Sequence, residues 1–134
     1  MKIVYAGTPQ YAVAPLKALN EGGFEVVAVV TQEDRPVGRR GVITPPPVKQ
    51  YALSAGLPVY QFHRRREHVE ELKALGADAM FTCAYGQLLS REVLSVFPQG
   101  VWNAHASLLP KHRGASPVQS AILAGERVTG VTVM

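Results

Sequence analysis

The sequence predicts an α/β fold, in which helices cover both faces of a doubly wound, mostly parallel sheet in three αβα layers. Short apolar runs alternate with amphipathic segments along the whole chain, which is the pattern of strands separated by helices. Strands that are joined through helices are parallel neighbours with right-handed crossovers. The chain has 134 residues, of which 47% are hydrophobic and 18% charged, so it has the size and composition of one globular domain.

Six short apolar runs are predicted to form the strands. They are bounded by Gly, Pro or polar residues, and several are rich in β-branched side chains. The run FEVVAVVT at residues 24–31 is nearly all apolar, which is typical of a strand covered on both faces. In chain order, the strands are predicted at residues 2–6, 24–31, 57–61, 77–84, 100–105 and 130–134.

Helices are predicted between these strands from capping residues and glycine stops. Thr8 is a candidate N-cap with Pro9 in the first helical turn, and Ser116 with Pro117 repeats this pattern. The predicted helices run from residue 9 to the glycines at 22–23, over 48–54, over 65–75, from the turn at 85–86 to about residue 96, and over 117–124.

Residues 32–47 are predicted to be a long loop rich in Pro, Gly and Arg. Loops of this length inside a compact domain are usually functional. Arg35, Arg39, Arg40 and Lys49 supply four positive charges in and beside it, as many as the net charge of +4. Such a cluster favours an anionic partner and would give salt-dependent attraction to RNA. The alternative interpretation is a solvated, mobile surface loop.

The turn after the first strand has the sequence Ala6-Gly7-Thr8-Pro9. A helix N-terminus attracts phosphate, but this turn has neither G-x-G-x-x-G nor a phosphate-loop lysine. We therefore expect Gly7 to allow a tight turn and Thr8 to cap the helix. The sheet is predicted to be Rossmann-like in shape, with a generic nucleotide-binding domain as the weakest alternative.

Polar residues interrupt the predicted strand at 100–105 near its carboxyl end, which is where ligands bind in open α/β sheets. Alternation places Asn103 and His105 on the same face of an extended chain. An amide can stabilise an oxyanion and an imidazole can donate a proton, so the pair suits acyl transfer to an amine from the substrate. A core histidine beside a turn-forming asparagine is an equally good interpretation.

The segment NAHASLLPKHRGASP at residues 103–117 resembles the signature of the 10-formyltetrahydrofolate-dependent formyltransferase family. Within that family, YAGTP at 5–9, TQEDRPVGR at 31–39 and PVK at 47–49 resemble the members that formylate methionyl-tRNA. The resemblance extends over essentially the whole chain. It implies an enzyme of translation initiation that moves a formyl group from 10-formyltetrahydrofolate, its co-substrate, to the methionine carried by the initiator tRNA.

The resemblance also implies site residues, and the lists here follow the family's motifs. Asn103 would polarise the formyl oxygen, and His105 would assist it and shuttle a proton. The residues implied to bind folate are Tyr85, Gly86, Gln87, Leu88, Ser107, Leu108, Leu109 and Pro110. Those implied to bind tRNA are Arg39, Arg40 and Lys49. No metal is expected, because His63, His68 and His112 have no ligand spacing.

The same family implies how the chain is organised. Residues 1–134 are expected to be the N-terminal, folate-binding catalytic domain, ending before an Asp that would pair with His105. A C-terminal tRNA-binding barrel is expected to be absent from this chain. Two alternatives remain: a formyltransferase for a sugar-nucleotide amine or glycinamide ribonucleotide, and a fragment that binds folate without catalysis.

The remaining features suit a cytoplasmic protein, expected to be monomeric in its parent form and without a membrane partner. No run approaches the ~20 apolar residues of a membrane span. Cys83 is a single cysteine in an apolar run, so we expect it in the core. Arg64, Arg65 and Arg66 form a second basic run, which acidic residues follow, and we expect it to be a solvated helix entrance.

Overall fold

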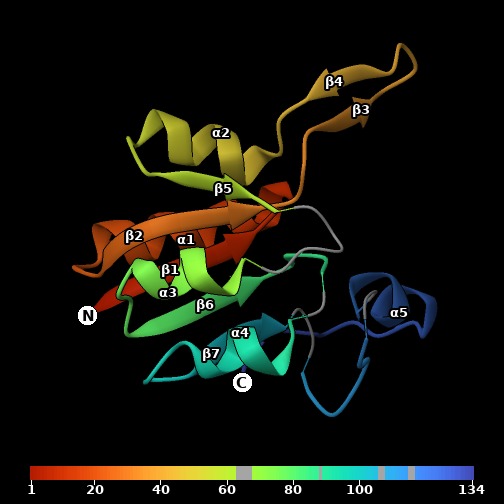
Figure 1. The fold of residues 1–134 in the computed structure, drawn as a ribbon. Helices are drawn as coiled ribbons and strands as arrows, with labels where there is room; N and C mark the ends of the chain where they lie inside the picture. Colours follow the sequence, from red (N-terminus) through yellow and green to blue (C-terminus); the bar gives the residue numbers. More distant parts are fainter. Residues whose placement is uncertain (63–67, 88, 106–107, 115–116) are drawn as a thin grey trace.

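The computed structural model describes residues 1–62, 68–87, 89–105, 108–114 and 117–134 (Figure 1). Its main sheet has six strands in the spatial order β5-β2-β1-β6-β7-β8. In chain order these strands are β1 (Lys2–Gly7), β2 (Glu25–Thr31), β5 (Val59–Gln61), β6 (Ala79–Cys83), β7 (Val101–His105) and β8 (Thr132–Val133).

The topology of the sheet confirms the predicted Rossmann-like class. β1 lies at the centre, the next two sheet strands extend to one side of it, and β6, β7 and β8 extend to the other. The pairs β1–β2, β1–β6, β2–β5 and β6–β7 are all parallel. The order reverses between β1 and β6, and in such sheets ligands bind outside the carboxyl ends of the strands near this reversal.

The last strand differs from the prediction of parallel crossovers throughout. β8 is antiparallel to β7, with Ala104 opposite Val133 and His105 opposite Thr132. Helix α5 (Pro117–Leu123) lies beyond the carboxyl ends of the strands and does not return to their amino ends (Figure 1). The chain therefore re-enters the sheet beside the end of β7 and runs back along it.

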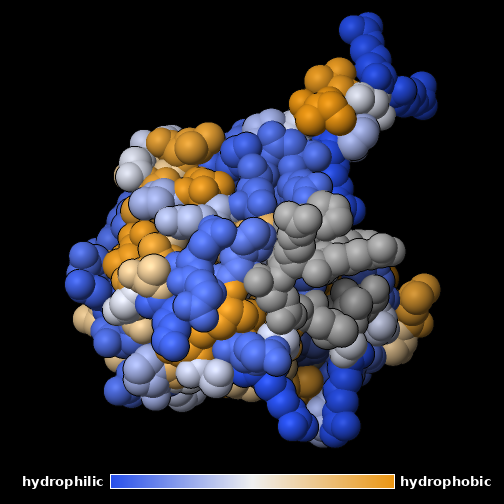
Figure 2. Space-filling view, viewed as in Figure 1, coloured by the Kyte–Doolittle hydropathy of each residue, from blue (hydrophilic) through white to orange (hydrophobic). Residues whose placement is uncertain are grey.

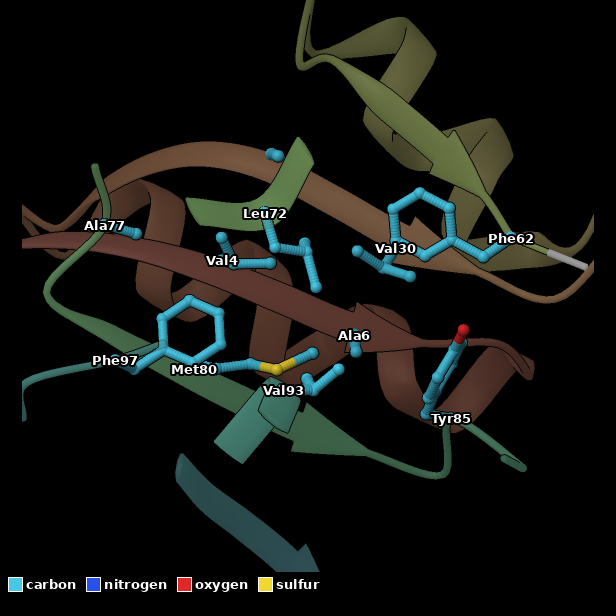
Figure 3. Close-up of a cluster of buried hydrophobic side chains, with 11 residues drawn as sticks. Val4, Ala6, Val30, Phe62, Leu72, Ala77, Met80, Tyr85, Val93 and Phe97 are labelled. Carbon is cyan, nitrogen blue, oxygen red and sulfur yellow. The ribbon is translucent and has the colours of Figure 1, made fainter. Parts of the chain in front are cut away.

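Helices cover the two faces of the sheet, as the three-layer prediction requires. α1 (Val13–Glu21) and α2 (Pro47–Ser54) bury Leu16 and Val48 against one face, together with Ile3 and Tyr5 of β1. α3 (Val69–Ala74) and α4 (Arg91–Ser95) bury Leu72 and Val93 against the opposite face of the sheet (Figure 3). The residues of this second cluster are Val4, Ala6, Ala28, Val30, Phe62, Leu72, Ala77, Met80, Tyr85, Val93 and Phe97.

Two helices start where predicted, whereas the predicted cap at Thr8 is wrong. Pro47 occupies the first turn of α2, and α5 begins at Pro117, both within a residue of the prediction. Thr8 is not an N-cap, because a 3₁₀ turn (η1, Gln10–Ala12) precedes α1 and the Thr8 hydroxyl donates elsewhere, to the carbonyl of Tyr85. At α4 the N-cap is Ser90, whose hydroxyl oxygen accepts from the N–H of Val93 at 3.2 Å.

Two further helices are shorter than predicted. α4 begins at Arg91, five residues after the turn at 85–86, and the described residues between them, 87, 89 and 90, are not helical. Of the predicted helix over 65–75, the described part is α3, Val69–Ala74. The basic run at 64–66 and the proposed cap Ser116 lie outside the described residues.

Gly7 does not serve a tight turn in the way predicted. It is the last residue of β1, and a Cβ there would lie 2.8 Å from the carbonyl oxygen of Cys83 and 3.1 Å from the Cβ of Ala12. Glycine therefore allows β1 to pack closely against β6 and η1. Cys83 is buried at 4% exposure, which confirms its predicted place in the core.

The predicted loop at 32–47 contains a hairpin. β3 (Arg35–Val37) and β4 (Val42–Thr44) pair antiparallel and project from the body of the protein (Figure 1). Figure 2 shows hydrophilic residues at the end of this projection and apolar ones nearer its middle. Its apolar side chains, Val37, Val42 and Ile43, are exposed. Neither strand has a buried face, so the sequence lacks the alternation of apolar and polar residues that would predict a strand.

In the part of the chain that the structure describes, no helix is long and apolar enough to cross a membrane.

Candidate active site

A pocket of about 680 Å³ lies at the carboxyl end of β7, within the size range of small-molecule sites. Both residues of the predicted catalytic pair line it, and so do four described residues of the loop that follows β7. Its described lining consists of Asn103, His105, Leu109, Pro110, Arg113, Gly114 and Met134. The structure thus brings the predicted pair and part of the predicted folate loop to one cavity.

Hydrogen bonds hold Asn103 from both neighbouring strands. Its backbone N–H donates to the carbonyl of Met134 at 2.7 Å, and its carbonyl accepts from the Met134 N–H at 2.9 Å. On the other side, Asn103 is the register partner of Thr82 in β6, whose hydroxyl donates to Asn103 Oδ1 at 2.8 Å. With its oxygen engaged, the side chain offers its NH2 group to a ligand as a hydrogen-bond donor.

The ring of His105 is oriented by the loop that follows β7. Its Nε2 lies 2.8 Å from the backbone oxygen of His112. A carbonyl oxygen only accepts, so Nε2 carries the proton of this hydrogen bond and Nδ1 is the nitrogen that can exchange a proton with a ligand. His112 holds its carbonyl in this position with a left-handed backbone, φ 53°.

An ion pair fastens the same loop to the segment before β8. The Nε2 of His112 lies 2.9 Å from a carboxylate oxygen of Glu126, whose other oxygen is 3.5 Å from the ammonium of Lys111. The hydrogen bond from His112 holds the pKa of the Glu126 carboxyl below its usual range. Glu126 thus anchors the loop residue that orients His105.

The start of the described loop contacts the segment around β8 as well. The Leu109 N–H donates to the hydroxyl of Thr132 at 3.1 Å, and the peptide bond from Leu109 to Pro110 is cis. The side chain of Leu108 lies over Gly130, where a Cβ would come within 2.7 Å of it. Three of the predicted folate residues, Leu108, Leu109 and Pro110, therefore lie on a segment held by contacts with residues around β8.

The turn after β6 holds the other predicted folate residues and lies at the reversal of strand order. The carbonyl of Tyr85 accepts from the Thr8 hydroxyl at 2.8 Å and from the Gln32 side-chain amide at 3.0 Å. Gly86 has φ 87°, and a Cβ there would overlap the amide nitrogen of Gln32. Residues from the ends of β1 and β2 thus tie this turn in place. The described lining of the pocket does not include Tyr85, Gly86 or Gln87.

Tyr85 itself points into the core. Its side chain is buried, and burial raises the pKa of its hydroxyl to about 12, so the phenol stays protonated at neutral pH. Its backbone is the part that faces the reversal of strand order. Of the predicted folate residues, Leu88 and Ser107 lie outside the described residues.

Lys49, predicted to bind tRNA, contacts the base of the hairpin. Its ammonium lies 3.1 Å from both carboxylate oxygens of Asp34 and 2.9 Å from the amide oxygen of Gln61. The Gln61 amide nitrogen donates to Asp34 at 2.7 Å and to the carbonyl of Gln32 at 3.0 Å. Arg39 and Arg40, by contrast, are exposed in the turn between β3 and β4. The network of Asp34, Lys49 and Gln61 thus sets where the hairpin leaves the sheet.

We expect this network to make stability depend on acid pH. The hydrogen bonds from Gln61 and Lys49 lower the pKa of Asp34, so its contribution is present above the unfolded-state pKa of about 3.9 and is lost as pH falls through the folded value. Asp34→Asn should lower the free energy of unfolding by about 1 kcal/mol at pH 7. This loss is smaller than that for a buried charged hydrogen bond, because the carboxylate of Asp34 is partly exposed. The free energy of unfolding of both proteins, measured from pH 7 to pH 2, should converge at the acid end.

The exposed neighbour Glu33 provides a matched control, because Glu33→Gln removes an adjacent charge without touching the network. Trypsin, which cleaves after arginine, should cut at Arg39 and Arg40 faster in Asp34→Asn than in Glu33→Gln. Equal cleavage rates in the two variants would show that the network does not hold the hairpin.

Sequence reasoning missed several residues of the site. Arg113 and Gly114 belong to the quoted signature, but only the structure places them in the pocket. One feature of the sequence could have drawn attention to Thr82: it is a polar residue in an otherwise apolar strand. Among the described residues, no group of three or more His, Cys, Asp or Glu side chains is arranged to hold a metal ion.

Fold and pocket together define a Rossmann-like α/β domain with a pocket at the carboxyl end of β7, where sheets of this kind bind ligands. The sequence profile of a family described as formyl transferase matches residues 1–134. The chain belongs to the formyl transferase family.

Its curated relatives include two proteins named methionyl-tRNA formyltransferase. That of Symbiobacterium thermophilum is 54% identical over 136 residues, covering 100% of this chain and 42% of the relative. That of Bacillus subtilis is 49% identical over 135 residues, covering 99% of this chain and 43% of the relative. The chain therefore spans less than half the length of these relatives.

Solved structures with the same fold include proteins named as a formyltransferase and as a deformylase. Phosphoribosylglycinamide formyltransferase from Bacillus halodurans matches with a TM-score of 0.77 at 21% identity, covering 99% of this chain and 70% of that one. A formyltetrahydrofolate deformylase from Pseudomonas syringae matches with a TM-score of 0.73 at 17% identity, covering 98% and 44%. At these identities the likeness shows the fold.

Proposed function

We propose that this chain is the formyl-transfer domain of an enzyme that formylates methionyl-tRNA, with 10-formyltetrahydrofolate as donor. The observation that carries the proposal is the placement of Asn103 and His105 in one pocket with Leu109 and Pro110. Family membership supports the donor. The names of relatives about 50% identical over the whole chain support the acceptor. Translation initiation in the cytoplasm is the setting that this reaction implies.

The proposed reaction needs an oxyanion donor and a proton carrier. The acceptor amine attacks the formyl carbon, and the NH2 group of Asn103 donates to the oxygen that becomes negative in the tetrahedral intermediate. The C–N bond to the folate nitrogen then breaks, and the proton lost by the amine passes to that nitrogen. His105 carries this proton at Nδ1, a role worth ~10²–10⁴ in rate.

The positions of three arginines support two anionic partners, a folate and a tRNA. Arg113 lines the pocket, where its guanidinium suits carboxylate groups of a folate. Arg39 and Arg40 are exposed at the tip of the β3–β4 hairpin, where guanidinium groups can contact phosphates or stack on unpaired bases of a tRNA end. Tyr85, Gly86 and Gln87 would present backbone groups to the pterin ring.

The test is an acceptor comparison with the full-length protein and 10-formyltetrahydrofolate. We expect formyl transfer to initiator methionyl-tRNA, and at most trace transfer to glycinamide ribonucleotide or to a sugar-nucleotide amine. Faster transfer to either small amine would overturn the tRNA assignment, and no transfer to any acceptor would overturn the enzymatic one. The 134-residue chain alone, assayed in parallel, tests the alternative of a folate-binding module without turnover.

A second arm of the comparison isolates the hairpin. Combining Arg39→Ala with Arg40→Ala should weaken tRNA binding and reduce the salt slope of log K by about 1–2, because each phosphate contact contributes roughly one unit. Arg91→Ala, at an exposed arginine on α4, is the matched control. An unchanged salt slope in the double variant would remove the hairpin from the tRNA interface.

A further inference from the structure

Thr82 is a polar residue at a buried position of β6. It is 7% exposed, in a strand whose other residues are alanine, methionine, phenylalanine and cysteine. In the sheet it lies between Ala6 of β1 and Asn103 of β7, its register partners on the two sides. A valine would have nearly the same shape and is also common in strands, so packing alone does not call for the hydroxyl.

The hydroxyl of Thr82 donates a hydrogen bond to the side chain of Asn103. Its Oγ1 lies 2.8 Å from Asn103 Oδ1 and 3.4 Å from the backbone oxygen of Trp102. A hydroxyl has one proton to donate, and the shorter contact is the stronger one. Asn103 Oδ1 is therefore the main acceptor of the Thr82 proton.

In this hydrogen bond the Thr82 hydroxyl donates and Asn103 Oδ1 accepts, and that direction sets which end of the amide a ligand meets. A side-chain amide has an accepting oxygen and a donating nitrogen, and a rotation of 180° about its last bond exchanges them. With the oxygen turned to Thr82, the NH2 group is presented to the pocket. The opposite orientation would turn a carbonyl oxygen toward any negative charge that forms there and would repel it.

We propose that Thr82 is a positioning residue for Asn103: its hydroxyl fixes the amide with Oδ1 toward β6 and NH2 toward the pocket. The orientation itself follows from the contacts of these two residues. Its catalytic value rests on the proposed function, in which the NH2 group stabilises the oxygen of the formyl group.

The orientation can be tested without any activity. The chain contains two asparagines, Asn20 and Asn103, so labelling with [15N]asparagine gives two side-chain NH2 signals in the NMR spectrum. The Asn103 pair is assigned by its loss in Asn103→Ala. We expect a rigid Asn103 amide, with a high heteronuclear NOE, in the wild type and in Thr82→Ser. Thr82→Val should leave it mobile and shift its signals toward those of a free amide.

Two controls keep this experiment decisive. Thr31→Val removes the hydroxyl of another buried threonine, which donates to the backbone of Gln32, and it should leave the Asn103 signals unchanged. Thr82→Ala replaces the valine variant if that variant fails to fold. The proposal is wrong if the Asn103 amide is equally rigid without the hydroxyl, or if Thr82→Ser loosens it as much as Thr82→Val does.

Turnover of the full-length protein then measures the value of the orientation. Thr82→Val should lower kcat about tenfold, the effect of one lost hydrogen bond, while KM for the folate donor stays within about twofold. Thr82→Ser should restore most of kcat. A wild-type protein without formyl transfer would refute the proposed function, whereas the NMR result would still decide the position of Asn103. A normal kcat in a Thr82→Val protein with a mobile amide would refute the catalytic value of the orientation.

Discussion

Replacing Asn103 by alanine is expected to lower kcat for formyl transfer by about 10²–10³-fold in the full-length protein, as loss of a single oxyanion donor does in other enzymes. Folate binding should be nearly unchanged, because the loop residues Leu109 and Pro110 remain in place. Single-turnover kinetics with saturating donor would measure the rate loss, and fluorescence titration with a folate would measure binding.

Asn20→Ala is the matched control, since Asn20 is the other asparagine of the chain and lies on α1, which packs on the sheet. Both variants should unfold at nearly the wild-type temperature. Turnover close to that of the wild type in Asn103→Ala would rule out its role as oxyanion donor. An equal loss in Asn20→Ala would mean that the assay reports folding.

Replacing Gly86 by alanine should destabilise the protein by about 2–3 kcal/mol. Its backbone has φ 87°, where a side chain costs about 1–2 kcal/mol, and the new Cβ would displace the Gln32 amide from the Tyr85 carbonyl, which adds about 0.5–1.5 kcal/mol. The same displacement should raise KM for the folate donor, if the turn at 85–87 forms part of the folate site as proposed.

Gly23 separates the two costs of the Gly86 substitution. Its φ is 91°, and a Cβ there would meet no atom within 4 Å, so Gly23→Ala reports backbone strain alone. Chemical denaturation of both variants should give the larger loss of unfolding free energy for Gly86→Ala. Equal losses would mean that the contact between Gln32 and Tyr85 does not stabilise the turn.

The parts of the fold that depend on burial could be predicted from the sequence. The apolar runs at β1, β2 and β6 identify central strands, because residues covered on both faces leave no polar alternation. The β3–β4 hairpin was not predictable in this way, since Val37, Val42 and Ile43 are exposed and leave no contrast between a buried and a solvated face. The reversed direction of β8 was not predictable either, because an apolar pattern does not encode strand direction.

The site was predictable where its residues are close in sequence. Asn103 and His105 are two residues apart on one strand, so alternation alone places them together. Thr82 and Glu126 contact the site from other elements, 21 and 14 residues away from Asn103 and His112 respectively, and only the sheet register and the loop geometry bring them there. Lys49 illustrates the converse, because its charge is visible in the sequence while its partners Asp34 and Gln61 are not.

The backbone of Asn103 links the pocket to the hydrogen-bond ladder of the sheet. Its N–H and its carbonyl both bond to Met134, at 2.7 and 2.9 Å, while its side chain lies in the pocket. An amide that is hydrogen-bonded in a sheet exchanges its proton with solvent only when that pairing opens. Hydrogen exchange at the amide of Asn103 therefore measures how often this wall of the pocket comes apart.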